Sequence, residues 1–394
     1  MIEDQKSHET LSSATDPLTE RRGRRSASEL WGWTRPFRPV LFLVVALFVV
    51  FSVTQPVFFT ATNLQNMLVA VSVLWIISMG MTFALLSGGV DLSVSANGAL
   101  AGIFLAKIIA NGVPAGLAIV LTVAFAAIVG LVVNGFLVGK LRLSFFVVTL
   151  ASMTALTGVV NLWSGTVSFF VTSSVVGYLA TAHLGGVAVP IWIMLAVFVL
   201  FFYVQRWTYF GRDVYAVGGS LAAARLSGVH TSRTLVAIYG VTGACAGFAG
   251  VILVGSIGAA SPQVDGTLPL QAVAAVLLGG TALSGGAGGV AGTAFGVLFI
   301  GELANGLSIA GVSGFWQQVV TGIILVIAVF GSSTTEGRRS LLQIAHLSGS
   351  PPDHGPIRVG REGAGDERVT IADERVAPGV HQLGREPPHA QPSP

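Results

Sequence analysis

The sequence predicts an all-α, polytopic membrane protein with about ten transmembrane helices and glycine-rich breaks between some of them. Of its 394 residues, 53% are hydrophobic and only 10% are charged, whereas soluble domains carry about 25% charged residues. Most of the charge lies in the two ends of the chain. Between positions 40 and 333 the charged residues are Asp91, Lys107, Lys140, Arg142, Arg206, Arg212, Asp213, Arg225, Arg233, Asp265 and Glu302. A membrane domain is therefore predicted over residues 40–333.

The two ends of the chain differ from this domain in composition. Residues 1–39 are polar and contain "RRGRR" at 21–25, so they are predicted to form a basic cytoplasmic leader. A cleaved or twin-arginine signal peptide is the alternative, but no A-x-A-like cleavage site follows the first apolar run. Residues 334–394 mix charge, proline and glycine without periodic apolar content, which predicts a disordered cytoplasmic tail.

Ten apolar segments approach the roughly 20 residues that a membrane-spanning helix needs. They are residues 40–55, 67–87, 95–110, 115–138, 145–163, 189–205, 234–254, 270–287, 291–309 and 315–331. With ten spans, four basic clusters fall on one side, which predicts that both termini are cytoplasmic. These clusters are Arg21, Arg22, Arg24 and Arg25; Lys140 and Arg142; Arg206, Arg212, Arg225 and Arg233; and Arg338 and Arg339. Among the basic residues of the domain, only Lys107 falls on the other side.

Two glycine-rich segments interrupt the apolar pattern and resemble each other. "GGVDLSV" at 88–94 aligns with "GGTALSG" at 279–285. Broken backbone at membrane depth is tolerated only where protein buries it or a cavity wets it, and paired breaks of this kind point to a transporter. Close helix packing by small residues is the alternative. The residues assigned to broken-helix or gating segments are Gly88, Gly89, Asp91, Ser93, Gly279, Gly280, Ser284 and Gly285.

Asp91 is the acidic residue of the first of these segments. It precedes "LSVSANGALAG", a run able to start a helix, so we expect Asp91 to cap that helix by accepting hydrogen bonds from its first N–H groups. A coupling or gating role and direct substrate contact are the alternatives. The second segment has Ala282 at the matching position, so the repeat as such does not require an acid.

The connection at 211–234, "GRDVYAVGGSLAAARLSGVHTSRT", is the longest basic loop. Within it, "SLAAARLSG" predicts a short helix that starts at Ser220 and stops at Gly228. Together with "LLSGGVDLSVSANGALAG", "GKLRLSFFVVTLASMTALTG", "AVLLGGTALSGGAGGVAGTAFG" and "ANGLSIAGVSGFWQQVVTGIILVIAVF", this loop resembles the membrane permease subunit of ribose-type ABC importers, which carry monosaccharides and related polyols. The resemblance covers roughly residues 60–331.

The resemblance implies a homodimeric, ten-span permease in the bacterial cytoplasmic (inner) membrane. Its partners would be a cytoplasmic ATP-binding-cassette ATPase, an extracytoplasmic sugar-binding protein and membrane lipid. The short helix would be the coupling helix that docks in a groove of the ATPase. The residues assigned to ATPase coupling are Ala223, Ala224, Arg225, Leu226, Ser227 and Gly228. An ordinary cytoplasmic anchor is the alternative for Arg225.

This chain departs from the family pattern at two places. The family usually has acidic residues just before the "AARLSG" core, where this chain has Leu221 and Ala222, so no salt bridge to the ATPase is expected at that point. "RLSFF" at 142–146 lacks a proline common in the family, so the entry into the next span is expected to differ.

The sequence holds no pattern typical of an enzyme or of a nucleic-acid-binding protein. "NGFLVGKL" at 134–141 fails the Walker A pattern, so ATP–Mg is expected on the partner ATPase. His183 and His230 are isolated, so no metal or catalytic site is proposed. The basic residues form no aromatic-interleaved patch. Cys245 is predicted to be a small packing residue.

Two rival classes of membrane protein remain. An ion-gradient-driven secondary transporter needs an intramembrane acid, and Glu302, near Asn305, is the candidate. The glycine-rich breaks argue against the other rival, a membrane scaffold without transport activity.

A substrate path for a neutral polyol needs amides, hydroxyls and aromatic faces. The residues proposed to line it are Asn97, Asn161, Trp163, Gln271, Asn305, Trp316 and Gln317. An interhelical polar contact is the alternative for each of them. The resemblance implies that the binding protein captures the sugar before it reaches this path.

Overall fold

The computed structural model of the chain describes residues 38–330. The predicted tail and nearly all of the predicted leader lie outside the described residues. By its internal contacts the chain divides into residues 1–343 and 344–394. Only the first unit contains described residues, and the account below concerns residues 38–330 alone.

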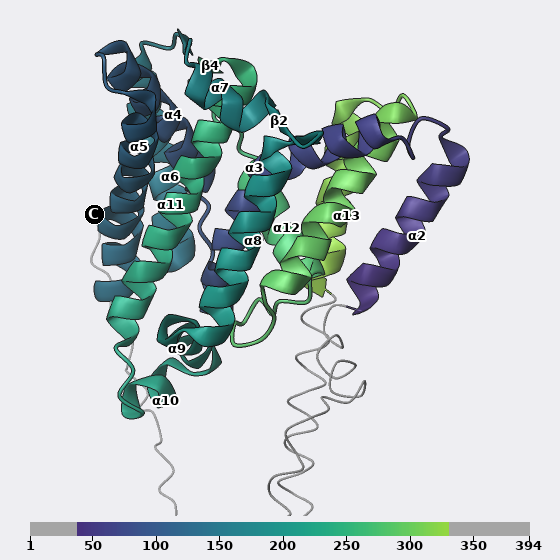
Figure 1. Cartoon of the computed structure of the whole chain (residues 1–394). Coiled ribbons are helices and arrows are strands. Elements are labelled where there is room, and N and C mark those ends of the chain that lie inside the picture. The colour runs from purple at the N-terminus through teal and green to yellow at the C-terminus, as the bar shows by residue number, and fades with distance from the viewer. Residues whose placement is uncertain (1–37, 331–394) are drawn as a thin grey trace, which may run out of the picture. The chain divides into compact units, whose positions relative to one another are not determined.

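The described part of the chain is almost entirely helical (Figure 1). Six helices are long and apolar enough to cross a membrane: α3 (Ala61–Leu86), α5 continued by η3 (Ala115–Val129 and Gly130–Lys140), α6 (Phe145–Ser164), α8 (Val189–Trp207), α11 (Thr231–Ile257) and α13 (Val290–Ile309). Four apolar helices are shorter: α2 (Arg38–Thr54), α4 (Val94–Ala110), α12 (Leu268–Leu278) and Gly314–Phe330. The helical membrane-protein class is confirmed, while ten membrane crossings stay a prediction.

Short elements lie at the two ends of the helices (Figure 1). At one end, called here the α10 end, are α9 (Tyr209–Gly219) and α10 (Leu221–Leu226). At the other, the β4 end, are α7 (Ser174–Thr181) and two antiparallel strand pairs: β1 (Phe169–Phe170) with β4 (Ala259–Ala260), and β2 (His183–Leu184) with β3 (Val187–Ala188). The sequence did not predict α7 or these two-residue strands, which are too short to carry a periodic pattern.

Helices α3 and α11 form the centre of the described unit. In α3 78% of the most apolar window is buried and in α11 67%, against 22% in α5–η3, α6 and α8. The outer helices expose large apolar side chains, including Val120, Phe146, Leu162 and Val199. Such a surface suits contact with lipid chains, because the helical backbone is satisfied internally and only apolar side chains face outward.

The π-helix η3 packs on α11 through glycine. A Cβ atom added to Gly130 would lie 2.2 Å from the carbonyl oxygen of Tyr239, and one added to Gly139 would lie 2.9 Å from the backbone nitrogen of Val236. No larger residue fits at these contacts without moving one of the helices. The two backbones are therefore in direct contact along this face. π-Helical turns are rare and are frequently found at functional sites.

The eighth predicted span, residues 270–287, is wrong in its second half. Helix α12 ends at Leu278, and residues 279–289 form a loop. Gly280 has a φ of +85°, a left-handed conformation that ends the helix.

Candidate functional site

The two glycine-rich segments end their helices in the same way. After α3, the Gly88 N–H donates to the Leu85 carbonyl and the Gly89 N–H to the Ala84 carbonyl. After α12, Gly280 and Thr281 make the corresponding bonds to Leu277 and Val276. Both are Schellman motifs with a left-handed glycine just past the helix. The structural match pairs Gly88 with Gly280, one position away from the pairing in the sequence alignment.

The ends of the two segments lie against each other at the α10 end. The Gly286 N–H donates to the Leu86 carbonyl over 2.8 Å. A Cβ atom on Gly285 would lie 2.7 Å from the Gly88 nitrogen, and one on Gly218 in α9 would lie 1.8 Å from the Leu86 oxygen. We call residues 86–89, 218–219 and 284–286 the glycine junction. It brings the end of α3, the loop after α12 and the end of α9 into backbone contact.

A polar side-chain pair ties α8 and α9 to the loop after α12. The Tyr215 hydroxyl donates to the Gly288 carbonyl over 2.6 Å. Gln205 donates to the Tyr215 hydroxyl, and its Oε1 accepts from the Val290 N–H over 2.9 Å. Partial burial raises the pKa of Tyr215, so its hydroxyl stays protonated and remains a donor at neutral pH. Helix α9 is thereby held to the loop at its middle as well as at its end.

Helix α10 follows α9 directly and has the boundaries that the sequence predicts. The Ser220 hydroxyl accepts from the Ala223 N–H over 3.2 Å, which caps the start. Gly228, with a φ of +84°, lies just past the end. Ala224 is only 4% exposed, whereas Leu226 is 90% exposed. The helix is therefore seated through its small residue and presents its large apolar residue outward.

Two arginine side chains join α10 and the connection between η3 and α6 to the start of α11. Arg225 donates to the Thr231 hydroxyl over 3.2 Å, at the start of α11. Arg142, between η3 and α6, donates to Thr231 over 2.8 Å and to Ser232 over 3.3 Å. Arg142 has a φ of +60°, unusual for a residue other than glycine, and it lies where the family proline is missing. Two basic clusters of the sequence thus meet at the α10 end.

Asp91 does not cap α4 as we expected. Its Oδ1 accepts from the backbone N–H and the hydroxyl of Ser93, which is itself the residue before the helix, over 3.0 and 2.7 Å. Asn134 of η3 also donates to Oδ1, over 3.2 Å, and Thr242 of α11 donates to Oδ2 over 2.6 Å. The carboxylate is buried. It therefore joins three segments distant in sequence, and its donors stabilise the buried charge.

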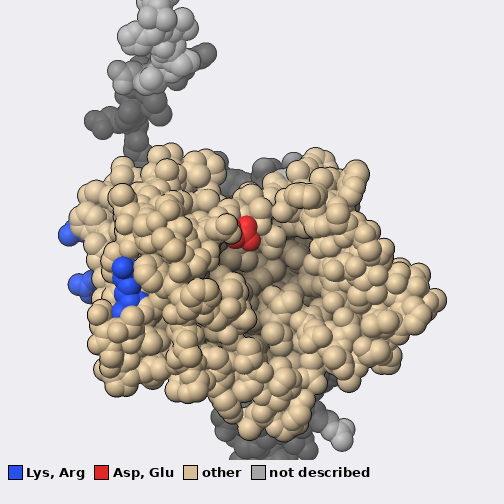
Figure 2. Space-filling view, turned by 90° about the horizontal axis from the view of Figure 1, so that it is seen from above, with Lys and Arg blue, Asp and Glu red and all other residues tan. Residues whose placement is uncertain are grey.

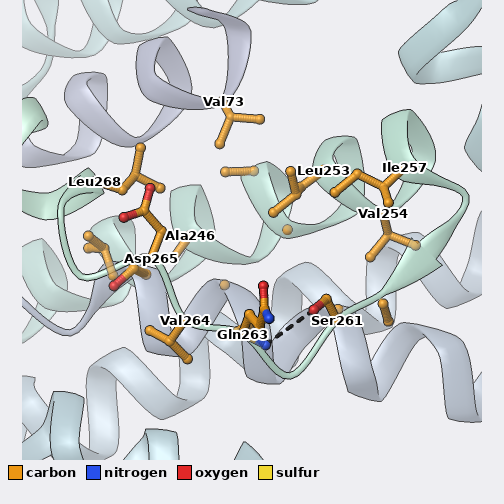
Figure 3. A pocket seen from close by; sticks show the side chains of 18 of the residues that line it. Val73, Ala246, Leu253, Val254, Ile257, Ser261, Gln263, Val264, Asp265 and Leu268 are labelled. Carbon is orange, nitrogen blue, oxygen red and sulfur yellow. Dashed lines mark hydrogen bonds between the residues drawn. The ribbon is translucent and has the colours of Figure 1, made fainter. Parts of the chain in front are cut away.

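A cavity of about 300 Å³ lies toward the β4 end, between α3, α4, α11 and the chain from Ala259 to Leu268. Figure 2 looks onto this end and shows a hollow in a surface with few charged groups. Figure 3 shows the lining, which is mostly apolar. Its polar members are Ser95, Ser261, Gln263 and Asp265. The volume is at the lower end of the range typical of small-molecule sites.

The seven residues proposed for a substrate path are scattered, and none of them lines this cavity. Asn97 donates to the Ala126 carbonyl, Asn305 pairs reciprocally with Asn63, and Gln317 donates to the Val312 carbonyl. Gln271 lines a separate cavity of about 100 Å³ beside the helix Gly314–Phe330. Asn161, Trp163 and Trp316 are exposed on the outer surface. The interhelical alternative therefore describes Asn97 and Asn305.

Sequence reasoning missed the residues that make the tertiary contacts. Tyr215 and Gln205 carry no local signal, because a lone Tyr or Gln at a helix end is common. Asn134 and Thr242 gain their role only from the carboxylate that they bond. Asp265 did carry a signal, since it is one of few acids in the membrane domain.

The architecture is that of a polytopic membrane permease. It combines paired glycine-rich breaks, an apolar outer surface and a short exposed helix at one end. Residues 63–329 match the family described as "Branched-chain amino acid transport system / permease component". The chain belongs to this family and, within it, to the ribose-type sugar ABC permeases. It is accordingly a multi-pass protein of the bacterial cytoplasmic membrane.

Three relatives illustrate the similarity. The ribose import permease protein RbsC of Escherichia coli K12 is 36% identical over 311 residues, which cover 78% of this chain and 96% of that protein. RbsC of Bacillus subtilis is 39% identical over 296 residues, covering 75% and 90%. The L-arabinose ABC transporter permease protein AraH of Azospirillum brasilense is 32% identical over 305 residues, covering 77% and 90%. No solved structure matches the chain.

Proposed function

We propose that this chain is the membrane-spanning subunit of an importer for a monosaccharide or related polyol, energised by a separate ATP-binding-cassette ATPase that docks on α10. The names of the ribose and L-arabinose permeases support the substrate class. The proposal includes a homodimer of ten-span subunits with cytoplasmic termini, an extracytoplasmic sugar-binding protein, and ATP–Mg bound by the ATPase.

The observation that carries the docking proposal is the contrast within α10. Leu226 is almost fully exposed on a helix whose start is capped by Ser220 and whose neighbour Ala224 is buried. A large apolar side chain on a short, anchored helix suits insertion into a groove of a partner. Arg225 is exposed and also donates to the Thr231 hydroxyl, so we propose that it ties α10 to the start of α11 in addition to the contact with the ATPase.

A route for mechanical coupling follows from the contacts of α9. Helix α9 connects directly to α10, and its end packs on the glycine junction, where α3 and the loop after α12 meet. The bonds of Tyr215 and Gln205 hold α9 to the same loop. A displacement of α10 by the ATPase would therefore be passed as a rigid-body movement to the ends of α3 and α12.

The charge distribution supports a cytoplasmic position for the α10 end. Arg142, Arg212 and Arg225 lie there, on or beside α9 and α10. Lys107 lies at the β4 end, 4.8 Å from the ring centroid of Phe169 in β1. An excess of Lys and Arg marks the cytoplasmic side of a membrane protein.

The test is transport by purified protein in liposomes together with its ATPase. Sugar accumulation should require both the ATPase and ATP. Ala224→Trp should abolish both transport and co-purification of the ATPase, because a tryptophan cannot occupy the buried position. Leu221→Ala, in the same helix, is the matched control and should retain both. Full assembly and transport with Ala224→Trp would place the docking site elsewhere.

A second candidate, ion-gradient-driven transport, is favoured by one observation. Glu302 in α13 is 5% exposed, and its Oε2 has no hydrogen-bond partner among the described residues. An intramembrane acid of this kind is a standard ion or proton site. Accumulation of sugar under a proton or sodium gradient without ATPase, lost in Glu302→Gln, would establish this mechanism and overturn the ATP-driven one.

A further inference from the structure

The cavity at the β4 end has one charged lining residue, Asp265, and no Lys or Arg among the described residues that line it. We propose that this cavity is a transit site for an uncharged polyol and that Asp265 makes it reject anionic sugars such as phosphorylated or acidic ones. The inference rests on the proposed function, because it assigns the sugar's path within the same permease.

The walls of the cavity are made by small residues where α4 and α11 cross. A Cβ atom on Gly250 would lie 2.4 Å from the Gly98 oxygen, so these helices are in backbone contact beside the cavity. Val73 and Ile77 of α3 also line the cavity. Apolar side chains can contact the C–H groups of a sugar ring without forming hydrogen bonds to its hydroxyl groups.

Three of the four polar lining residues, Ser261, Gln263 and Asp265, lie on the chain between β4 and α12, and the fourth, Ser95, lies on α4. Asp265 Oδ1 accepts from the backbone N–H and the hydroxyl of Thr267, over 2.8 and 2.7 Å. No described residue donates to its second carboxylate oxygen. Figure 3 shows the Asp265 carboxylate among the lining side chains, with Gln263 and Ser261 further along the same segment. These three residues offer acceptors and donors to sugar hydroxyls.

The negative charge of Asp265 determines whether neutral or anionic sugars are favoured in the cavity. A free carboxylate oxygen accepts hydrogen bonds from hydroxyl groups, and such charge-assisted bonds are among the stronger ones. The same carboxylate repels a phosphate or carboxylate group, and no lining cation compensates for that repulsion. A neutral polyol is therefore favoured in the cavity over a sugar acid or a sugar phosphate.

Two substitutions separate a purely structural role of Asp265 from the proposed role of its charge in selecting neutral sugars. Its bonds to Thr267 form a turn before α12, and the side-chain oxygen of asparagine can accept the same two bonds. Asp265→Asn therefore keeps the turn and removes the charge. Asp265→Glu keeps the charge.

The experiment measures charge in the cavity with thiol reagents on the full chain. In a Cys245→Ala background, which removes the only cysteine, Ser261→Cys places a thiol in the lining. Its modification rates by a cationic and an anionic methanethiosulfonate are compared. We expect the cation-to-anion rate ratio to fall by about tenfold on adding Asp265→Asn and to be retained with Asp265→Glu. Ser256→Cys, which is exposed and outside the lining, is the matched control, and its ratio should not change.

Sugar protection tests the solute class in the same protein. D-ribose should slow modification of the Ser261→Cys thiol by a neutral methanethiosulfonate, and D-ribose 5-phosphate at equal concentration should not. Adding Asp265→Asn should let the phosphate protect as well. An unchanged rate ratio, protection by neither sugar, or equal protection by both with Asp265 present would overturn the proposal. An importer that transports no sugar while the ratio behaves as expected would instead refute the proposed function.

Discussion

Replacing Gly218 by alanine should uncouple the permease from its ATPase by opening the glycine junction. The added Cβ atom would lie 1.8 Å from the Leu86 oxygen and 2.6 Å from the Gly286 nitrogen. These two atoms are joined by a hydrogen bond. Both are backbone atoms that cannot rotate away, so α9 must move off the junction or the hydrogen bond must break.

The size of the effect follows from these two costs. Overpacking by one methyl group in a tight contact costs about 1–3 kcal/mol, and the loss of one backbone hydrogen bond costs about 1 kcal/mol. Together they disfavour the seated position of α9 by about 2–4 kcal/mol. At 1.4 kcal/mol per tenfold, the equilibrium constant that favours the packed position of α9 over a displaced one falls by roughly 30-fold to several hundredfold. Gly219→Ala is the matched control, because nothing lies within 4 Å of a Cβ atom there.

The assay compares the two variants in the complete importer. ATP-driven sugar uptake and thermal stability in detergent should both fall for Gly218→Ala and stay at the unsubstituted level for Gly219→Ala. The ATPase should still bind Gly218→Ala in a pull-down, because α10 itself is unchanged. Equal uptake and equal melting temperatures for the two variants would refute the idea that α9 is coupled through this contact.

Other predictions concern α10, Asp91 and the tail. Gly228→Val should weaken ATPase binding and uptake, because a left-handed backbone costs a branched residue roughly 1–2 kcal/mol; normal pull-down would contradict this. Thr242→Val should lower the melting temperature by removing a bond to the Asp91 carboxylate worth about 1.5–3 kcal/mol. Thr122→Val, which loses only a bond to its own helix, should not, and equal losses would count against the network. Deleting residues 340–394 should leave insertion and uptake intact, and lost uptake at unchanged membrane abundance would show that the tail is needed.

The features that the sequence predicts correctly are those encoded within a few neighbouring residues. The start of α10 at Ser220 and its stop near Gly228 depend on one capping hydroxyl and one left-handed glycine. The apolar helices follow from runs of hydrophobic residues. The glycine-rich break after Leu278 was placed inside a predicted span, because an apolar run does not show where the helix ends.

Composition and local chemistry by themselves determined that this chain is a helical membrane protein with two glycine-rich breaks and a short helix that starts after Ser220 and stops before Gly228. Only the tertiary structure decided that the two glycine-rich breaks, nearly 200 residues apart in the sequence, contact each other beside the end of α9. It also decided that Asn134 of η3 and Thr242 of α11 donate hydrogen bonds to Asp91. It also placed Asp265, rather than the predicted amides, in the cavity. The physical reason is that a glycine allows a close backbone contact and a buried acid needs hydrogen-bond donors, and both properties can be read from the sequence. Which backbone or which donors meet them depends on how helices distant in the sequence pack together.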